Sequence, residues 1–164
     1  MAVVYISIGS NIERDKYIRA GINALIAIYG EVVCSPVYES IAIGFAGDNF
    51  YNLVVSFETE QNHKQVGEVL SSIEDQNGRD RNAAKFSART LDLDLLLYDD
   101  LIIKENKLTL PRPEIYQNAF VLRPLADIAA DLLDPLSGQT FGKLWSTYDQ
   151  TSQNLWPVPF DLQV

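Results

Sequence analysis

The sequence predicts an α+β fold in which one antiparallel β-sheet carries two helices on one face. Two segments, around residues 18–29 and 62–77, place apolar residues at helical spacing, and four other segments have strand-like apolar patterns. Their order along the chain is βαββαβ, which is the ferredoxin-like pattern. At 164 residues, the chain is long enough for a sizeable core, and we expect a single domain over 1–164.

The first half of this pattern can be assigned from the N-terminus onward. Val3–Ile8 is an apolar strand, and the glycine, serine and asparagine directly after it favour a turn. Apolar residues then recur at helical spacing from Ile18 to Tyr29. The helix is expected to end at Gly30, since glycine is common just past a helix end. The run Val32–Tyr38 is the expected second strand.

The second half repeats the order strand, helix, strand. Tyr51–Glu58 is the third strand, and Asn62 can cap a helix that ends at Asn77-Gly78. Arg89–Tyr98 is the fourth strand. The expected additions to this core are a hairpin near Ile102–Leu110, two short helices around Ala119–Ala129 and Thr140–Ser146, and an extended tail at Pro157-Val158-Pro159 that ends in disorder.

The composition indicates which kinds of partner are unsuited to this protein, but it says little about its activity. The net charge of −9 argues against nucleic acid or an anionic membrane as the main partner. The single cysteine, Cys34, can form no intrachain disulfide, and we expect it in the core rather than as a nucleophile. The sequence shows no signal-like segment and no apolar run of membrane-spanning length. We therefore expect a cytoplasmic protein that acts on small molecules, as a monomer or weak dimer.

Two aspartates on the fourth strand form the first candidate site. In a strand, residues two apart share a face and lie roughly 7 Å apart, at about 3.3 Å rise per residue. Asp92 and Asp94 therefore present neighbouring carboxylates, and the leucines between and beside them occupy the other face. Such a pair can bind one or two Mg²⁺ ions together with substrate phosphates. The alternative is a solvated acidic face, which is disfavoured because aspartate is depleted in strands and like charges repel there.

A cationic stretch directly precedes this strand. Although the whole chain is acidic, residues 79–89 carry four cations: Arg79, Arg81, Lys85 and Arg89. Arginine suits phosphate because its planar fork donates two parallel hydrogen bonds. A cationic loop beside a carboxylate pair supplies what phosphoryl transfer needs, namely positioning and charge neutralisation. The alternative is an ordinary solvated loop.

These two features resemble a known family. The run Arg89-Thr90-Leu91-Asp92-Leu93-Asp94-Leu95 is similar to the signature of 6-hydroxymethyl-7,8-dihydropterin pyrophosphokinase, an enzyme of folate biosynthesis. Further matches follow in the family's order over about residues 3–145: Gly9-Ser10-Asn11, Tyr38-Glu39-Ser40, Tyr51-Asn52-Leu53, Glu74, Gly78-Arg79, Leu108-Thr109-Leu110-Pro111 and Ala119–Leu125. Each short motif is weak by itself, but together they are specific. The resemblance implies transfer of pyrophosphate from ATP to the hydroxymethyl group of the pterin, with release of AMP.

The resemblance also assigns roles on the phosphate side. It implies that Asp92 and Asp94 hold two Mg²⁺ ions, and that Arg79 and Arg89 act in catalysis by neutralising the triphosphate. The hydroxyl of the pterin would attack the β-phosphorus, with Asp92 able to help accept its proton. The implied nucleotide-binding residues are Glu74, Arg81, Lys85, the backbone around Leu95, Lys107, Thr109 and Arg112. A solvated helix-end carboxylate remains an alternative for Glu74.

A second group of residues is implied on the pterin side. Ser40 and Ile43 would offer backbone groups to the edge of the ring. Asn52 is polar within an otherwise apolar strand, and an amide both donates and accepts, which suits the mixed edge of a pterin. Phe50 and Phe120 would be the aromatic walls between which the ring stacks. Without the resemblance, the alternative for both phenylalanines is a place in the core.

The chain departs from the family pattern at several positions. Arg112 stands where a Pro-His-Pro motif has histidine, and Asn118 stands where the family has an arginine. Other departures are Ile41-Ala42 for paired prolines, Asn82 for a basic residue, Phe86 for tryptophan and Ser87-Ala88 for Gly-Pro. Loss of a phosphate-side cation lowers the rate of such reactions strongly. A catalytically weak paralog that binds a pterin or nucleotide is therefore an alternative, and a ferredoxin-like regulatory module is another.

Overall fold

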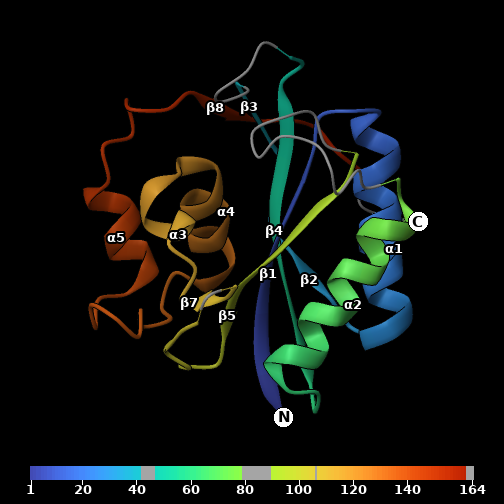
Figure 1. Ribbon diagram of the computed structural model, residues 1–164. Coiled ribbons are helices and arrows are strands. Elements are labelled where there is room, and N and C mark those ends of the chain that lie inside the picture. The colour runs from blue at the N-terminus through green and yellow to red at the C-terminus, as the bar shows by residue number, and fades with distance from the viewer. Residues whose placement is uncertain (42–46, 79–89, 106, 162–164) are drawn as a thin grey trace.

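The computed structural model describes residues 1–41, 47–78, 90–105 and 107–161. Figure 1 shows the helices and strands formed by these residues. The elements of the βαββαβ part are β1 (Ala2–Ser10), α1 (Arg14–Tyr29), β2 (Val33–Cys34), β3 (Tyr38–Ser40), β4 (Phe50–Thr59), α2 (His63–Gln76) and β5 (Asp92–Tyr98). They are followed by β6 (Ile103–Lys104), β7 (Thr109–Leu110), α3 (Glu114–Gln117), α4 (Ala119–Ala129), α5 (Phe141–Thr147) and β8 (Leu155–Pro157).

The main sheet has the strand order β5-β1-β4-β3-β8, and β2 also pairs with β4. Every pairing in it is antiparallel, and β1 lies between β4 and the edge strand β5. Helices α1 and α2 cover one face, whereas α3, α4 and α5 lie on the other (Figure 1). The ferredoxin-like prediction is confirmed, and the C-terminal helices turn the two-layer arrangement into three layers.

The two faces of the sheet bury separate sets of side chains, as period-two alternation requires. Leu53, Val55 and Phe57 of β4 pack with residues of α1 and α2. Val54, between them, packs on the other face with residues of α4 and α5. Leu91 continues the first set and approaches α1 at Gly21, where an added Cβ would lie 3.1 Å from the leucine side chain. In β4, the face to which a side chain points therefore follows directly from its parity, whereas in β5 the alternation is interrupted after Leu95 by a register shift against β1.

The predicted second strand is not continuous. Val32–Tyr38 was expected as one strand, but the structure has the short strands β2 and β3 with Pro36 between them. Proline has no N–H to donate to the ladder, so pairing with β4 stops there. The preceding Ser35 holds the break against β4, because its side-chain oxygen accepts a hydrogen bond from the Val54 amide at 2.9 Å.

The helix ends follow local sequence signals. Helix α1 begins at Arg14, four residues before the first apolar position of the predicted pattern, and ends before Gly30, which has a φ of 84°. Asn62 caps α2 as predicted: its side chain accepts from the Gln65 amide, and the Gln65 side chain accepts from the Asn62 amide. The hairpin β6–β7 and the two later helices are also observed, and α3 is an additional single turn.

The C-terminal tail is extended, as predicted, but part of it forms a strand. Residues 155–157 form β8, which pairs antiparallel with β3 and becomes an edge of the sheet. Beyond it, Val158 and Phe160 pack against the core on the α1 side. Residues 162–164, where disorder was expected, lie outside the described residues.

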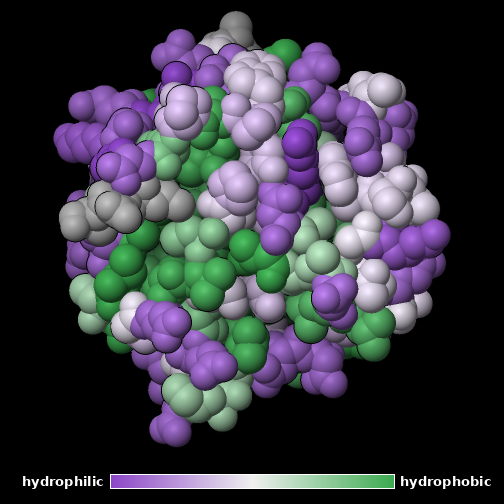
Figure 2. Space-filling view, turned by 180° about the vertical axis from the view of Figure 1, so that it is seen from behind, coloured by the Kyte–Doolittle hydropathy of each residue, from purple (hydrophilic) through white to green (hydrophobic). Residues whose placement is uncertain are grey.

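The surface on the α1 side is partly apolar. Figure 2 shows the molecule from the back of the view in Figure 1, and apolar side chains gather over part of this surface. Ile26 and Ile28 of α1 and Val33 of β2 are among the exposed large apolar residues. Among the described residues, no helix is both long and apolar enough to span a bilayer.

Candidate active site

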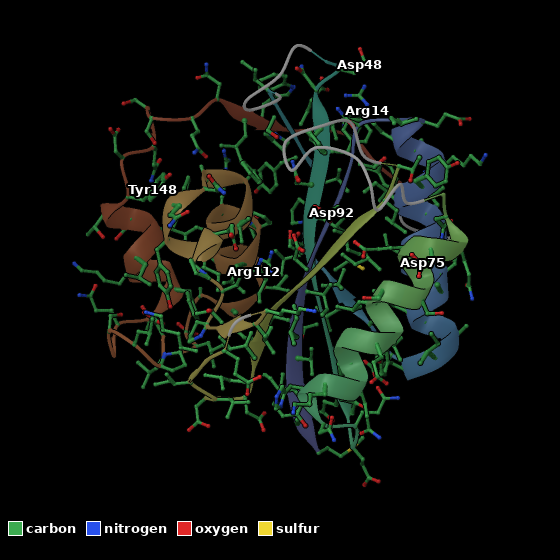
Figure 3. All side chains as sticks on the ribbon, viewed as in Figure 1. Arg14, Asp48, Asp75, Asp92, Arg112 and Tyr148 are labelled. Atoms are coloured by element: carbon green, nitrogen blue, oxygen red, sulfur yellow. The ribbon has the colours of Figure 1, made fainter. Side chains whose placement is uncertain are left out.

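The two aspartates of β5 point to the same face of the sheet. Leu93 and Leu95 are buried against α1 and α2, so Asp92 and Asp94 point to the opposite face, where α3 and α4 lie. Both aspartates are half-buried. In Figure 3, Asp92 lies at the sheet, and Arg112 lies on the side of α3 and α4. This is the carboxylate pair that the alternation of β5 predicts.

Arg112 comes from the segment between β7 and α3 and packs along β5. Its amide donates a hydrogen bond to the Leu96 carbonyl at 3.0 Å, which fixes the backbone at the outer edge of the strand. Its guanidinium Nη2 lies 3.4 Å from Asp94 Oδ1, and its Nε lies 2.7 Å from Glu114 Oε2. One cation therefore lies between a carboxylate of the strand and a carboxylate of the following helix.

The electrostatics of this cluster are dominated by negative charge. Burial raises the pKa of Asp94 to about 7, and the Asp92 carboxylate is the next cause. Glu74 and Glu114 raise this pKa further, whereas Arg112 lowers it. A cation placed among these carboxylates would offset the repulsion that contributes to the raised pKa of Asp94. The cluster therefore has the charge of a cation site.

The donor set fits Mg²⁺ that is shared with a substrate. Within the described ranges, no group of three or more His, Cys, Asp or Glu side chains is arranged to hold a metal ion without help. Mg²⁺ usually binds one or two carboxylates and completes its octahedron with waters and substrate phosphates. Asp92 and Asp94 supply two carboxylates of this kind, and the remaining positions would be open to a polyphosphate.

Glu74, near the end of α2, contacts the backbone of β5. Its side chain is buried, and its Oε2 accepts a hydrogen bond from the Leu93 amide at 2.9 Å. Strand β5 is an edge of the sheet, so this amide between the two aspartates has no neighbouring strand to pair with. The observed contact is thus one that holds the aspartate pair in place. The assignment of Glu74 to nucleotide binding stays a prediction.

Asn52, one of the predicted pterin residues, lies next to the aspartates, across the glycine of β1. Gly9 is paired with Asn52 of β4 on one side and with Asp92 of β5 on the other. A Cβ added at Gly9 would lie only 2.9 Å from Asn52 Oδ1 and 3.8 Å from Phe50 Cδ1. Directly opposed residues share a face. Asn52 and Asp92 therefore point to the same side of the sheet, and the absent side chain of Gly9 leaves space between them.

Ser40 completes this group at the end of β3. The Asn52 side-chain nitrogen donates to the Ser40 hydroxyl at 2.9 Å, and both residues are buried. Phe50 lies two residues before Asn52 on the same face and is half-buried. Phe120, in the first turn of α4, is also half-buried and packs at the margin of the core between the sheet and α4. Both phenylalanines thus retain exposed ring surface, unlike residues of the interior.

The remaining predicted site residues differ in their exposure, and some of them lie outside the described residues. Lys107 is exposed, and Thr109 is half-buried in β7. The Leu95 side chain is buried in the core, so its backbone alone can serve a nucleotide. The following predicted site residues lie outside the described residues: Ile43, Arg79, Arg81, Lys85 and Arg89.

Three further residues of this region escaped the sequence reasoning. Gly9 was noted as part of a turn and of a family motif, whereas the structure places it inside β1, where it separates the two predicted sites. Glu114 directly follows the Pro-Arg-Pro segment, and a carboxylate two residues from an arginine was the available signal. Gln153 contacts Asn118 at 3.1 Å and Ala119 at 2.8 Å, and no signal in the sequence connects these distant segments.

A hollow lies at the end of the sheet near α1, away from the aspartates. It has a volume of about 520 Å³ and a polar lining that includes Arg14, Glu39 and Asp48. Arg14 and Asp48 lie away from Arg112 in Figure 3. Arg14 is paired with Glu39 at 3.3 Å and stacks over the Tyr51 ring. Its charge is therefore already balanced, and this hollow does not resemble a phosphate site.

Comparisons with known proteins identify the family of the chain. The family model of 7,8-dihydro-6-hydroxymethylpterin-pyrophosphokinase (HPPK) matches residues 5–130. The 2-amino-4-hydroxy-6-hydroxymethyldihydropteridine pyrophosphokinase of Synechocystis sp. is 37% identical over 131 residues, which cover 80% of this chain and 66% of the relative. Its namesake in Bacillus subtilis is 35% identical, with 77% of each chain covered. That of Haemophilus influenzae is 34% identical, with 84% of this chain and 88% of the relative covered.

Solved structures share the fold at lower identity. A crystal structure of Plasmodium falciparum HPPK-DHPS with pterin and p-hydroxybenzoate has a TM-score of 0.71 at 13% identity, covering 90% of this chain and 43% of that one. The present chain thus spans less than half of that longer protein. Because the family model covers most of the sequence and the bacterial relatives are similar over most of its length, the chain belongs to the 7,8-dihydro-6-hydroxymethylpterin-pyrophosphokinase family.

Proposed function

We propose that this chain transfers pyrophosphate from ATP to the hydroxymethyl group of 6-hydroxymethyl-7,8-dihydropterin, giving the pterin diphosphate and AMP. The main support is the register of three strands. It places Asn52, on the pterin side, and Asp92, on the phosphate side, at directly opposed positions on either side of Gly9. The reaction needs the pterin hydroxyl and the β-phosphate to meet, and this arrangement brings their proposed binding groups together.

On the pterin side, recognition would combine polar and aromatic contacts. Asn52 would present donor and acceptor groups to the ring edge, and its contact with Ser40 fixes the orientation of the amide. Phe50 and Phe120 would stack on the two faces of the ring. Ile43 would add a backbone contact. Excluding water with aromatic surface would also keep the hydroxyl available for attack rather than solvated.

On the phosphate side, Asp92 and Asp94 would hold two Mg²⁺ ions, which when bound neutralise phosphate charge and orient the triphosphate. Arg79 and Arg89 would neutralise further charge, and Arg112 would contribute beside Asp94. The pterin oxygen forms a bond to the β-phosphorus, and the bond between this phosphorus and the oxygen bridging to the α-phosphate breaks. AMP leaves with the bonding electrons, and Asp92 would help to accept the hydroxyl proton.

Other groups would hold the nucleotide itself. We assign this role to Glu74, Arg81, Lys85, the Leu95 backbone, Lys107, Thr109 and Arg112. Of these, Arg112 has direct structural support, because it is fixed to β5 and lies beside Asp94. The protein is proposed to act in the cytoplasm as a single domain, as a monomer or weak dimer. Light scattering of the purified chain would test the oligomeric state.

The first experiment is an assay of AMP and pterin diphosphate formation with Asp94→Asn. We expect kcat to fall by about 10²-fold or more, as for loss of one charge-stabilising group in a transition state. Asp100→Asn is the matched control, since Asp100 is an exposed turn residue just past the same strand. Normal activity of Asp94→Asn would contradict the proposed role of the aspartate pair.

A catalytically weak paralog is the second candidate, and one observation favours it. Asn118, which replaces a family arginine, is held by Gln153 and brings no charge. Calorimetry with a non-hydrolysable ATP analogue, Mg²⁺ and 6-hydroxymethylpterin separates the two functions. Binding of both ligands by a wild-type protein that releases no AMP would establish the paralog. Release of AMP that depends on the pterin would exclude it.

A further inference from the structure

The C-terminal segment reaches both walls of the proposed pterin site. Its strand β8 pairs with β3, so that Leu155 lies opposite Ser40. Two residues earlier, Gln153 contacts the start of α4, next to Phe120. Ser40 and Phe120 come from opposite sides of the proposed pocket, and residues 153–155 connect them. The family match ends at residue 130, so this connection lies beyond the matched region.

Gln153 takes the place of a missing helix cap. Asn118 is the N-cap residue of α4, but its side chain makes no capping hydrogen bond. The Ala119 amide, in the first turn, instead donates to Gln153 Oε1 at 2.8 Å. The side-chain nitrogen of Gln153 donates to Asn118 Oδ1 at 3.1 Å and to the Gln117 carbonyl at 3.3 Å. The side-chain amide of Gln153 therefore pairs with a backbone N–H that has no partner within α4, and it also holds the two residues that precede the helix.

The contact is supported on either side by the rest of the segment. The Tyr148 hydroxyl donates to the Gln117 carbonyl at 2.9 Å, and the Tyr148 ring stacks on Trp145 of α5. On the other side, the Val158 amide donates to the Val37 carbonyl at 3.0 Å. Gln153 is thus held between two anchored points and reaches α4 from a fixed position.

We propose that Gln153 is a positioning residue for the pterin: it fixes the first turn of α4, and with it Phe120, at a set distance from Ser40. The inference rests on the proposed function, since it assumes that the pterin ring binds between β4 and Phe120. Gln153 itself need not touch the substrate. Its effect is on binding of the pterin rather than on the phosphoryl step, because the aspartates of β5 are held independently by β1 and Glu74.

The test compares Gln153→Ala with Gln153→Glu and Gln150→Ala. Loss of one helix cap predicts a rise of about five- to tenfold in the pterin KM for Gln153→Ala. The KM for ATP and kcat should stay within about twofold of wild type, since the contacts of Asp92, Asp94 and Arg112 are unchanged. Gln153→Glu keeps an acceptor for the Ala119 amide and should restore most of the pterin affinity. Gln150 lies in the same segment, and among the described residues its side chain donates only to the Trp145 carbonyl, so Gln150→Ala should match wild type.

Amide hydrogen exchange at Ala119 gives a readout that does not depend on the pterin. Gln153→Ala should accelerate this exchange, and Gln153→Glu should not. Unchanged exchange and unchanged pterin KM in Gln153→Ala would overturn this inference and leave the proposed function standing. Failure of the wild type to bind 6-hydroxymethylpterin would overturn the proposed function and the pterin role of Gln153 with it. If Gln153→Ala does not fold, Gln153→Asn, which is one methylene shorter, carries the same comparison.

Discussion

Arg112 Nη2 lies 3.4 Å from Asp94 Oδ1, so that a permanent cation touches a carboxylate proposed to bind Mg²⁺. The same guanidinium is held on its other side by Glu114, with 2.7 Å between Nε and Oε2. In the protein without ligands, Arg112 thus compensates part of the negative charge around the aspartates. A divalent cation and Arg112 would compete for Asp94, and the released guanidinium would then be beside the phosphates.

The first prediction follows from this competition. Arg112→Ala should bind a divalent cation more tightly than wild type in the absence of nucleotide, by a factor of about three to ten for one partly exposed charge pair. The same variant should have a higher KM for ATP, because a phosphate ligand is lost. Titration with Mn²⁺, followed by electron paramagnetic resonance, measures the first effect without turnover. Arg112→Lys, which keeps the charge, is the control, and equal Mn²⁺ affinity in all three proteins would refute the competition.

A second prediction concerns the pH dependence of stability. In the folded protein, burial and the neighbouring carboxylates of Asp92, Glu74 and Glu114 raise the pKa of Asp94 to about 7, against the lowering effect of Arg112. A raised pKa means that the folded state holds this proton more tightly than the unfolded state. The resulting stabilisation is complete below the ordinary aspartate pKa and is lost as the pH rises through about 7.

Urea unfolding at pH 5 to 8, with EDTA present, tests this expectation. The wild type should lose stability over this interval, whereas Asp94→Asn should lose less and should be the more stable protein at pH 8. The Asp94 side chain is 31% exposed, so solvent screens its charge. The difference in stability between the two proteins should therefore be smaller than for a fully buried carboxyl with the same pKa. Parallel pH profiles for the two proteins would show that Asp94 does not titrate in this range.

A third prediction concerns the space at Gly9. In Gly9→Ala, the new Cβ would lie 2.9 Å from Asn52 Oδ1, so the amide must move away from its contact with Ser40. We expect pterin affinity to fall by about tenfold or more, because the orientation of the amide is lost. Calorimetry with 6-hydroxymethylpterin measures the effect.

Gly67→Ala is the matched control for this change. Gly67 lies inside α2, and a Cβ there would meet nothing within 4 Å. Alanine should stabilise the helix by about 0.5–1 kcal/mol and leave pterin binding unchanged. If Gly9→Ala bound the pterin as tightly as Gly67→Ala does, the proposed position of the ring beside Asn52 would be wrong.

The sequence predicted those features that depend on local periodicity. The alternation of β5 placed Asp92 and Asp94 on the face opposite the leucines, and Asn62 marked the start of α2. The expected second strand ignored one local signal: Pro36 lies inside it, and its missing N–H explains the break. Such features can be derived because neighbouring residues determine them.

Other features depend on contacts between distant segments. The contact between Arg112 and Asp94 requires the segment after β7 to pack along the edge of β5. The contact between Gln153 and Ala119 joins residues 34 positions apart. Neither residue pair has a spacing that periodicity could reveal. Asn118 could be recognised as a departure from the family, but its partner could be found only in the folded chain.

The last prediction concerns Glu74 of α2. Variants at this position distinguish a structural role from a role in binding the nucleotide. Glu74→Ala would leave the Leu93 amide without its acceptor at a buried edge, at a cost of about 1–3 kcal/mol in the free energy of unfolding. Glu74→Gln keeps an acceptor oxygen and removes the charge, so it should recover most of this stability. Glu68→Ala, at an exposed position of the same helix, should change stability by less than about 0.5 kcal/mol.

Kinetics of the same variants then test how Glu74 acts. If it serves only to hold β5, kcat should follow stability: Glu74→Gln should be close to wild type, and Glu74→Ala should be impaired because Asp92 and Asp94 are displaced. Urea unfolding and steady-state AMP release supply the two measurements. A Glu74→Gln protein that is stable but has a raised KM for ATP would show instead that the charge of Glu74 acts on the nucleotide. Its contact with Leu93 would then be only part of its role.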